Sequence, residues 1–468
     1  MSKKKESTFS TGGNAVDTFD KDPFGHIEGG QVAAPIAQES AGGGRARKLM
    51  LGGLIVLAVI AIAAVAFATM NAGRSNDGAD SPEGAMQKFF DGLSEENLVA
   101  AVDAFLPSEA DPVIKYTGSI GSELKRLEVL SDDVDPTAVG GINLEFSDLE
   151  YRTEGVADGF VRVYVTNGDA LADLDPAELP LGNLVLDNLP PEALDALNED
   201  PLPESDSMAG GDFYLMAVEE DGGWYLSLWY TAMDAIFSET GYGTPAFGAG
   251  LAPVGADSAE AAVEAAIREV LSLDLEGLIG LLPPTEMRAL YDYIPLVMSD
   301  YNETVGAVSS FVTIELNSLG TSVSDADGGA KRVKIEGFDI SFSSFFLEID
   351  GAITYDGACF DITINDQGGT LSQFGGAIPE HINSCDTDLT GALGPDLGGV
   401  ETPDFLGDLG TANTGLIAVE EDGRWYVSPT ESLGDALLQG LRVWDKATLQ
   451  QYIDWLIGVG GADSGLGF

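Results

Sequence analysis

The string AVEEDGGWY at Ala217–Tyr225 occurs again as AVEEDGRWY at Ala418–Tyr426, and only Gly223 and Arg424 differ between the copies. A nine-residue match of this kind does not arise by chance, so the chain contains a duplicated unit. In each copy Asp-Gly lies between runs rich in apolar and aromatic residues, which predicts a β-hairpin with a turn at positive φ. The predicted turn residues are Asp221 and Gly222 in the first copy and Asp422 and Gly423 in the second.

The tryptophans of the two strings, Trp224 and Trp425, follow these turns on the returning strand. We expect both to face the side of the sheet on which helices pack, because large aromatic side chains contribute most to cores. The repeated string is therefore interpreted as a folding element and not as a binding site.

The duplication extends beyond the hairpin. Ser81–Tyr116 aligns without a gap with Ser258–Tyr293, and Arg162 matches Arg332. The longest insertion lies in the second copy, between residues 333 and 415. Because insertions between matched strands are usually surface loops, the two copies are predicted to share one fold.

Each copy is predicted to open with a helix capped by a serine, Ser81 or Ser258. A second, short helix is expected to begin at Ser94 or Ser272 and to end at Pro107 or Pro284. Alternating strands then predict an antiparallel sheet, whose segments are 142–149, 160–165, 311–319 and 331–335. The chain is expected to close with a helix over 433–457 that is interrupted near Asp445.

This order of helices, Pro-x-Glu, sheet and closing Asp-Gly-x-Trp-Tyr hairpin resembles the nuclear-transport-factor-2-like superfamily. The residues that carry the resemblance are Ser81–Pro107 with Ala217–Tyr225, and Ser258–Pro284 with Ala418–Tyr426. The resemblance implies an α+β fold with two tandem cone-like domains, each with helices packed on a curved antiparallel sheet. It also implies kinship with bacterial members that a membrane anchor holds outside the cell. It assigns no activity, because one fold hosts many functions.

An apolar segment, Leu49–Met70, runs for 22 residues without a charge. That length predicts a transmembrane helix, and Arg45, Arg47 and Lys48 before it predict a cytoplasmic N-terminus. A cleaved signal peptide is the alternative, with Ala66–Ala68 as its cleavage site. The expected division is a disordered tail (1–48), the helix (49–70), a linker (71–79), the first domain (80–240), a Gly/Pro linker (241–256) and the second domain (257–468).

The composition is strongly acidic, with 77 Asp and Glu against 22 Lys and Arg and a net charge of −55. Such a surface repels nucleic acid and anionic headgroups, so no nucleic-acid partner is expected. We interpret the scattered acids as a soluble surface and not as a site.

Few residues suggest chemistry. Tyr116 and Tyr293 match between the copies and are the candidates for a ligand pocket, although a packed core role is the alternative. His381 is the single histidine of the domains and is interpreted as incidental. Ser122-x-x-Lys125 lacks the companion motifs of its class. No catalytic constellation, metal site or cofactor is predicted, and acidic loops at 325–328 and 361–366 are interpreted as turns.

The two cysteines, Cys359 and Cys385, both lie in the insertion of the second copy. An even pair outside the cytoplasm predicts a disulfide, and two buried thiols are the alternative. A disulfide here predicts that the insertion is structured.

Together these features predict a membrane-anchored binding or interaction protein of the cell envelope without catalytic activity. Its partner is expected to be a small ligand, a wall component or an envelope protein. Two alternatives stay open: an isomerase or dehydratase with an Asp/Tyr pair inside one cone, and a signalling scaffold coupled to the tail.

Overall fold

A computed structural model describes residues 77–133, 140–175, 178–189, 204–208, 213–238, 240–366, 369, 381–383, 413–451 and 453. All of these residues belong to one compact unit, Met50–Phe468. The remaining segment, Met1–Leu49, lies outside the described residues.

The fold class needs one correction, which concerns the predicted transmembrane helix. Leu49–Met70 lies outside the described residues. Within the part of the chain that the structure describes, none of the helices combines the length and apolar character needed to cross a membrane. The described chain is therefore an α+β fold without the membrane-spanning helix that the fold class included.

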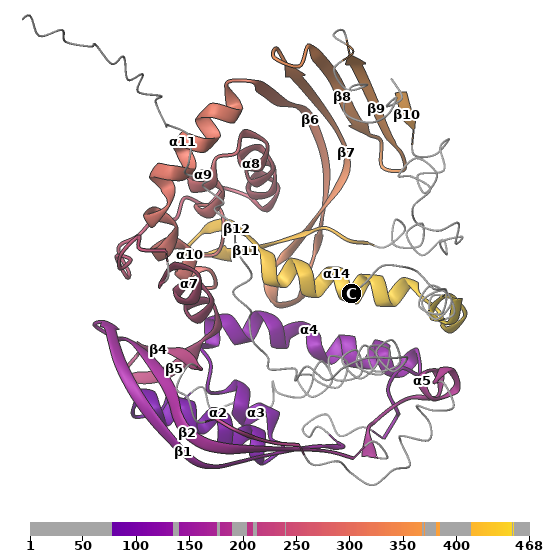
Figure 1. The fold of residues 1–468 in the computed structure, drawn as a ribbon. Helices are drawn as coiled ribbons and strands as arrows, with labels where there is room; N and C mark the ends of the chain where they lie inside the picture. Colours follow the sequence, from indigo (N-terminus) through magenta and orange to yellow (C-terminus); the bar gives the residue numbers. More distant parts are fainter. Residues whose placement is uncertain are drawn as a thin grey trace, which may run out of the picture. The chain divides into compact units, whose positions relative to one another are not determined.

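The first repeat forms an antiparallel sheet with helices on both faces (Figure 1). Its strands pair in the order β1-β2-β4-β5, and β3 also pairs with β2. The strands are β1 Ile142–Ala157, β2 Phe160–Leu174, β3 Glu204–Ser207, β4 Tyr214–Glu220 and β5 Gly223–Ser227. The helices are α2 Pro82–Ser94, α3 Leu98–Val102, α4 Pro107–Arg126, α5 Asn183–Asn188 and α7 Leu228–Ser238.

The second repeat has the same order of elements and a wider sheet. Its strands pair as β10-β9-β8-β7-β11-β12, with β6 on the other side of β7. They are β6 Val312–Asp325, β7 Lys331–Ser344, β8 Ile349–Tyr355, β9 Phe360–Asp366, β10 His381–Asn383, β11 Leu416–Glu421 and β12 Arg424–Ser428. The helical segments are α8 Ala259–Ser272, α9 Leu275–Ile279, α10 Arg288–Tyr293, η3 Ile294–Leu296, α11 Met298–Ser309, η4 Asp327–Gly329 and α14 Pro429–Val443.

The predicted hairpins are confirmed. Asp221 and Gly222 have φ of 54° and 82°, and Asp422 and Gly423 have φ of 50° and 79°. Two consecutive positive φ angles define the turn that matches the twist of a hairpin, and Asp-Gly tolerates them well. The turns therefore explain why the string is preserved in both copies.

The tryptophans lie on the predicted face. Trp224 is partly buried against α2, and Trp425 is partly buried against α8. Their backbones also hold the entry to each repeat, because Trp224 exchanges two hydrogen bonds with Ala79 and Trp425 does so with Ala256. Each hairpin thus ties the end of its repeat to the beginning.

The helices differ from the prediction in two respects. Ser81 and Ser258 cap α2 and α8 as expected, but the caps of α3 and α9 are Asn97 and Asp274, not Ser94 and Ser272. Their side-chain oxygens accept from the third amide of each helix, which satisfies a donor that the helix leaves free.

The second difference is a third helix. Pro107 begins α4 and does not end a helix, because proline suits the first helical position. Pro284 lies just before α10, so both prolines precede a helix that bears a matched tyrosine. In both repeats, the chain between the short helix and the sheet therefore forms a third helix, α4 or α10.

The insertion of the second repeat is structured over 349–366 and 381–383. The acidic segment 361–366 belongs to strand β9 and is not a turn. Cys359 is disulfide-bonded, and Cys385 lies outside the described residues. The closing helix α14 ends at Val443, and helical turns resume after Asp445, so the predicted interruption is confirmed.

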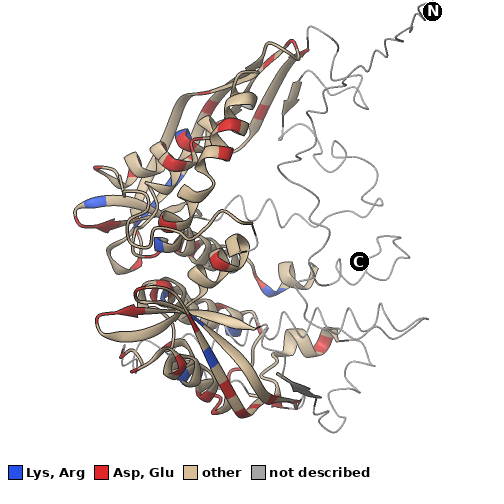
Figure 2. Cartoon of the chain, turned by 60° about the vertical axis from the view of Figure 1, so that its left-hand side comes forward, with Lys and Arg blue, Asp and Glu red and all other residues tan. Residues whose placement is uncertain are grey.

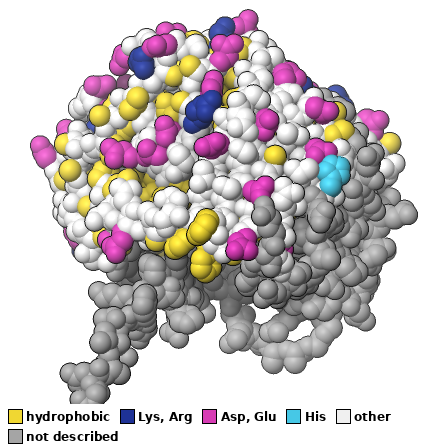
Figure 3. Space-filling view, turned by 90° about the horizontal axis from the view of Figure 1, so that it is seen from above, with side chains coloured by type: hydrophobic (Ala, Val, Ile, Leu, Met, Phe, Trp, Pro, Cys, Tyr) yellow, Lys and Arg dark blue, Asp and Glu magenta, His cyan; other side chains and the backbone are white. Residues whose placement is uncertain are grey.

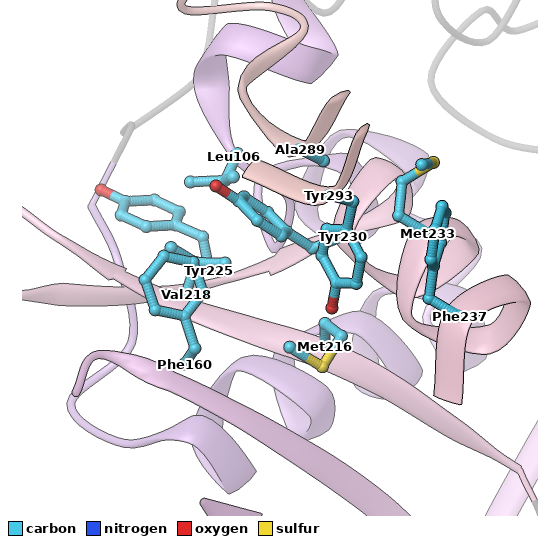
Figure 4. Packing of buried hydrophobic residues seen from close by; sticks show 10 residues of the cluster. All are labelled: Leu106, Phe160, Met216, Val218, Tyr225, Tyr230, Met233, Phe237, Ala289 and Tyr293. Carbon is cyan, nitrogen blue, oxygen red and sulfur yellow. The ribbon is translucent and has the colours of Figure 1, made fainter. Parts of the chain in front are cut away.

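Both repeats contribute to one core cluster of ten buried residues (Figure 4). The first repeat supplies eight of these residues, including Tyr230, Met233 and Phe237 of α7, and the second supplies Ala289 and Tyr293 of α10. Phe247, in the segment expected to be a linker, stacks on Phe160 with ring centroids 4.2 Å apart. The segment between the repeats is thus part of the packing that joins them.

Candidate functional site

A buried polar cluster lies where α10 of the second repeat meets the first. Arg162 of β2 donates two hydrogen bonds to the Asp234 carboxylate of α7, at 2.7 and 2.8 Å. The hydroxyl of Tyr214 donates to the same carboxylate at 2.8 Å, and that of Tyr293 donates at 3.1 Å. The predicted pocket residue Tyr293 is only 1% exposed, so its hydroxyl serves this cluster.

Four donors keep Asp234 ionised. Burial alone would raise the pKa of this carboxyl, but the hydrogen bonds from Arg162, Tyr214 and Tyr293 outweigh burial and lower it. Burial and the neighbouring carboxylate raise the pKa of Tyr293, so its phenol keeps its proton. The pair resembles the Asp/Tyr pair of the enzyme alternative, but both carboxylate oxygens are already bonded. A saturated carboxylate of low pKa is a poor general base.

The second repeat has a related cluster. Arg332 donates to both oxygens of Asp435 at 2.6 and 2.5 Å, as its counterpart Arg162 does to Asp234. Tyr116, which is 2% exposed, lies beside it and donates to Glu431 at 3.5 Å. Burial and the carboxylates of Glu431 and Asp435 raise the pKa of Tyr116. Each matched tyrosine is therefore buried against the other repeat.

The contacts between the repeats are reciprocal: equivalent elements of each repeat contact the other. α4 of the first repeat packs beside α14 of the second, and α10 packs on α7 (Figure 1). One matched contact joins the hydroxyl of Tyr230 to Asp292 at 2.6 Å. At the equivalent place, Lys115 pairs with Glu431 at 2.5 Å. A hydrogen bond from a tyrosine hydroxyl to a carboxylate on one side thus corresponds to an ion pair between lysine and glutamate on the other.

The Pro-x-Glu glutamates support the same helices. Glu109 accepts hydrogen bonds from Ser227 and from the Leu228 amide at 2.8 Å, at the start of α7. Glu286 accepts from Ser428 at 2.6 Å and from the Thr430 amide at 3.1 Å, at the start of α14. Burial raises the pKa of Glu109 to about 7 and also raises that of Glu286. These acids are helix supports that the sequence pattern had matched without explaining.

A groove on the second repeat lies apart from these clusters. It encloses about 400 Å³ between the C-terminal end of α8 and strand β6. The residues that line it are Arg268, Glu269, Leu271 and Ser272 of α8 and Ile314, Glu315, Leu316 and Asn317 of β6. Neither Tyr116 nor Tyr293 lines this groove.

Aromatic rings pack between the opening helix and the sheet of the first repeat. Phe90 of α2 and Phe146 of β1 pack with ring centroids 4.7 Å apart, and Phe213 lies 6.5 Å from Phe90. In the aligned sequence Phe90 corresponds to Ile267 and Phe146 to Leu316. Of these two aliphatic residues, Leu316 lines the groove and Ile267 does not. The aligned sequences show that phenylalanine is replaced by an aliphatic residue. Whether this leaves a groove depends on how the helix packs over the strands.

The other sequence candidates do not assemble into a site. Ser122 donates to the Gly118 carbonyl and Lys125 to the Asp132 carbonyl, so they do not form a catalytic pair. His381 lies at an exposed position 2.8 Å from Asp361. Among the described residues, no group of three or more His, Cys, Asp or Glu is arranged to hold a metal ion.

Comparison with known proteins gave no match to a family model, to a curated protein or to a solved structure. The candidate site consequently stands on its own geometry.

Proposed function

We propose that this chain is a non-catalytic binding protein and that its second repeat holds a small apolar ligand in the groove between α8 and β6. The observation that carries the proposal is the groove itself. Its volume of about 400 Å³ lies within the range of small-molecule sites, and Leu271, Ile314 and Leu316 give it an apolar surface.

The apolar surface continues across the neighbouring strands. Ile314 and Leu316 pair with Phe342 and Ile340 of β7, and directly paired residues share a face of a sheet. The same face continues through Ile353 of β8 to Ile362 of β9. The space-filling view shows apolar side chains gathered in patches between acidic ones (Figure 3). An elongated apolar molecule could thus extend from the groove along the sheet.

The buried clusters support a non-catalytic role. Asp234 and Asp435 are each held by an arginine, and their hydrogen bonds join helices to sheets. Such saturated pairs suit a rigid scaffold better than proton transfer. The bonded state of Cys359 supports a location outside the reducing cytoplasm. The helix-then-sheet order of each repeat supports the resemblance to the nuclear-transport-factor-2-like superfamily.

Binding of Nile red, a neutral apolar fluorophore, tests the proposal. The double variant Ile314→Phe/Leu316→Phe places aromatic rings on two residues that line the groove. Its change at Leu316 also introduces the residue that the first repeat has at the aligned position, Phe146. We expect the affinity for Nile red to fall about tenfold or more, because about 1.4 kcal/mol of lost contact already changes affinity by that factor. Near-ultraviolet circular dichroism checks that the variant is folded.

A matched control is Val323→Phe. Val323 lies on β6 like Ile314 and is equally exposed (39% against 38%), but it does not line the groove. It should leave Nile red binding unchanged. An unaltered affinity in the folded double variant would overturn the proposal and favour the wall component or envelope protein as partner.

A further inference from the structure

We infer that the groove between α8 and β6 selects apolar molecules with a cationic head and disfavours anionic ones. This inference rests on the proposed function and adds the chemical class of the ligand. The groove is lined by two acids, Glu269 and Glu315, and by one base, Arg268.

The single base is already engaged. One nitrogen of the Arg268 guanidinium lies 2.8 Å from Glu264, and another donates to the Leu316 carbonyl at 3.3 Å. Within the described part of the chain, no salt bridge joins Glu269 or Glu315 to a lysine or arginine. The charge offered to a ligand at this groove is therefore negative.

Glu269 lies in the space that a glycine leaves open. Its side chain lies against Gly277 of α9, where an added Cβ would come within 2.8 Å of the carboxyl carbon. In the first repeat, Gly92 aligns with Glu269 and Ala100 aligns with Gly277, so the glycine is on the other helix. There, Gly92 packs against the backbone of α3, and an added Cβ would lie 2.4 Å from the Ala101 amide nitrogen. The second repeat has thus placed an acid where the first has close helix packing.

The surroundings reinforce this choice. Acidic residues are spread over the helices and strands of both repeats, and basic residues are few (Figure 2). A net charge of −55 gives the whole surface a negative potential that attracts cations and repels anions. An amine or quaternary ammonium on an aliphatic chain satisfies both the charge and the apolar surface.

Displacement of Nile red by three amphiphiles with the same twelve-carbon chain tests the inference. The probes are dodecyltrimethylammonium, dodecyl maltoside and dodecanoate, each below its micellar concentration. We expect the cation to displace Nile red at about tenfold lower concentration than dodecanoate at low salt, with the neutral maltoside between them. The difference should shrink in 1 M salt, because salt screens exposed charges.

The variant Glu269→Gln/Glu315→Gln should reduce the preference for the cation and leave Nile red binding intact. Its control is Glu260→Gln/Glu303→Gln, which makes the same change of charge on exposed helix positions away from the groove. The control should keep most of the preference.

The outcomes separate the two proposals. If Nile red binds and all three amphiphiles displace it equally, or dodecanoate displaces it best, charge selection is wrong and the apolar groove stands. An equal loss of the preference for the cation in both double variants would also overturn charge selection by the groove, because the overall charge of the protein would then explain the preference. If Nile red does not bind the chain at all, the proposed function itself fails.

Discussion

The two repeats share one fold but treat the space between the opening helix and the sheet differently. The first packs Phe90 against Phe146 there, whereas the second has a groove of about 400 Å³ beside Leu316. Aromatic rings carry large buried area, and their loss leaves room that backbone shifts only partly close. Under the proposed function, duplication leaves one copy packed with aromatic rings while the other offers a groove to a ligand.

The largest expected effect concerns the arginine–aspartate pairs. Asp234→Ala should lower the free energy of unfolding by about 3–5 kcal/mol, because the partly buried Arg162 and the hydroxyls of Tyr214 and Tyr293 lose a shared acceptor. Asp435→Ala should cost less, since Asp234 accepts from two tyrosines as well, whereas Asp435 accepts, among the described residues, from Arg332 and Gln439. Urea denaturation of both variants gives the comparison. A larger loss for Asp435→Ala would mean that the clusters are not ranked by their hydrogen bonds.

The second effect is a pH dependence from Glu109, whose pKa is raised by burial from 4.5 to about 7. The folded state binds this proton more tightly than the unfolded state, so the stabilisation is full below pH 4.5. It is lost as pH rises to about 7, and it amounts to about 3 kcal/mol. Urea denaturation from pH 4 to 8 measures it. Glu109→Gln should flatten this part of the curve, and a curve as steep as that of the wild type would contradict the assignment to Glu109.

A smaller effect tests the single difference between the repeated strings. An added Cβ at Gly223 would lie 2.7 Å from Gly78, whereas Arg424 donates to the Val254 and Gly255 carbonyls at an exposed position. Gly223→Ala should therefore cost about 1–3 kcal/mol by overpacking. Arg424→Ala should cost about 0.5 kcal/mol, as exposed contacts do. Thermal unfolding of both variants checks the order, which equal losses would refute.

The smallest effect compares the matched tyrosines. Tyr293→Phe removes a 3.1 Å hydrogen bond to Asp234 and should cost about 1 kcal/mol. Tyr116→Phe removes a 3.5 Å contact to Glu431, which Lys115 already neutralises, and should cost less. Chemical denaturation in parallel resolves the difference. If the Tyr116 variant lost more, the longer contact would be the stronger one and the ranking would be wrong.

Local patterns predicted local structure well. Asp221-Gly222 predicted a turn because few dipeptides accept two positive φ angles, and Ser81 with Pro82 predicted a helix start because both suit its first positions. Prediction failed where two signals were close together. A proline such as Pro107 can follow the end of one helix or begin the next, and the local sequence is the same in both cases. Only the path of the chain after Pro107 decides between them.

The candidate site was less accessible to sequence reasoning. Tyr116 and Tyr293 were matched correctly, yet nothing local indicates that each packs against the opposite repeat. Leu316 is an ordinary core residue in a sequence, and the groove that it lines depends on the packing of α8 over β6. The substitution of aromatic by aliphatic residues at aligned positions was the one available signal.

The sequence by itself determined the duplication, the hairpin turns, the acidity and the first helix of each repeat, because these depend on neighbours in the chain or on composition. The tertiary structure decided the partners of Tyr116, Tyr293, Glu109 and Glu286, and it decided which repeat keeps a groove. Those properties depend on side chains far apart in the sequence, such as Arg332 and Asp435, whose burial exists only once helices and sheets have packed.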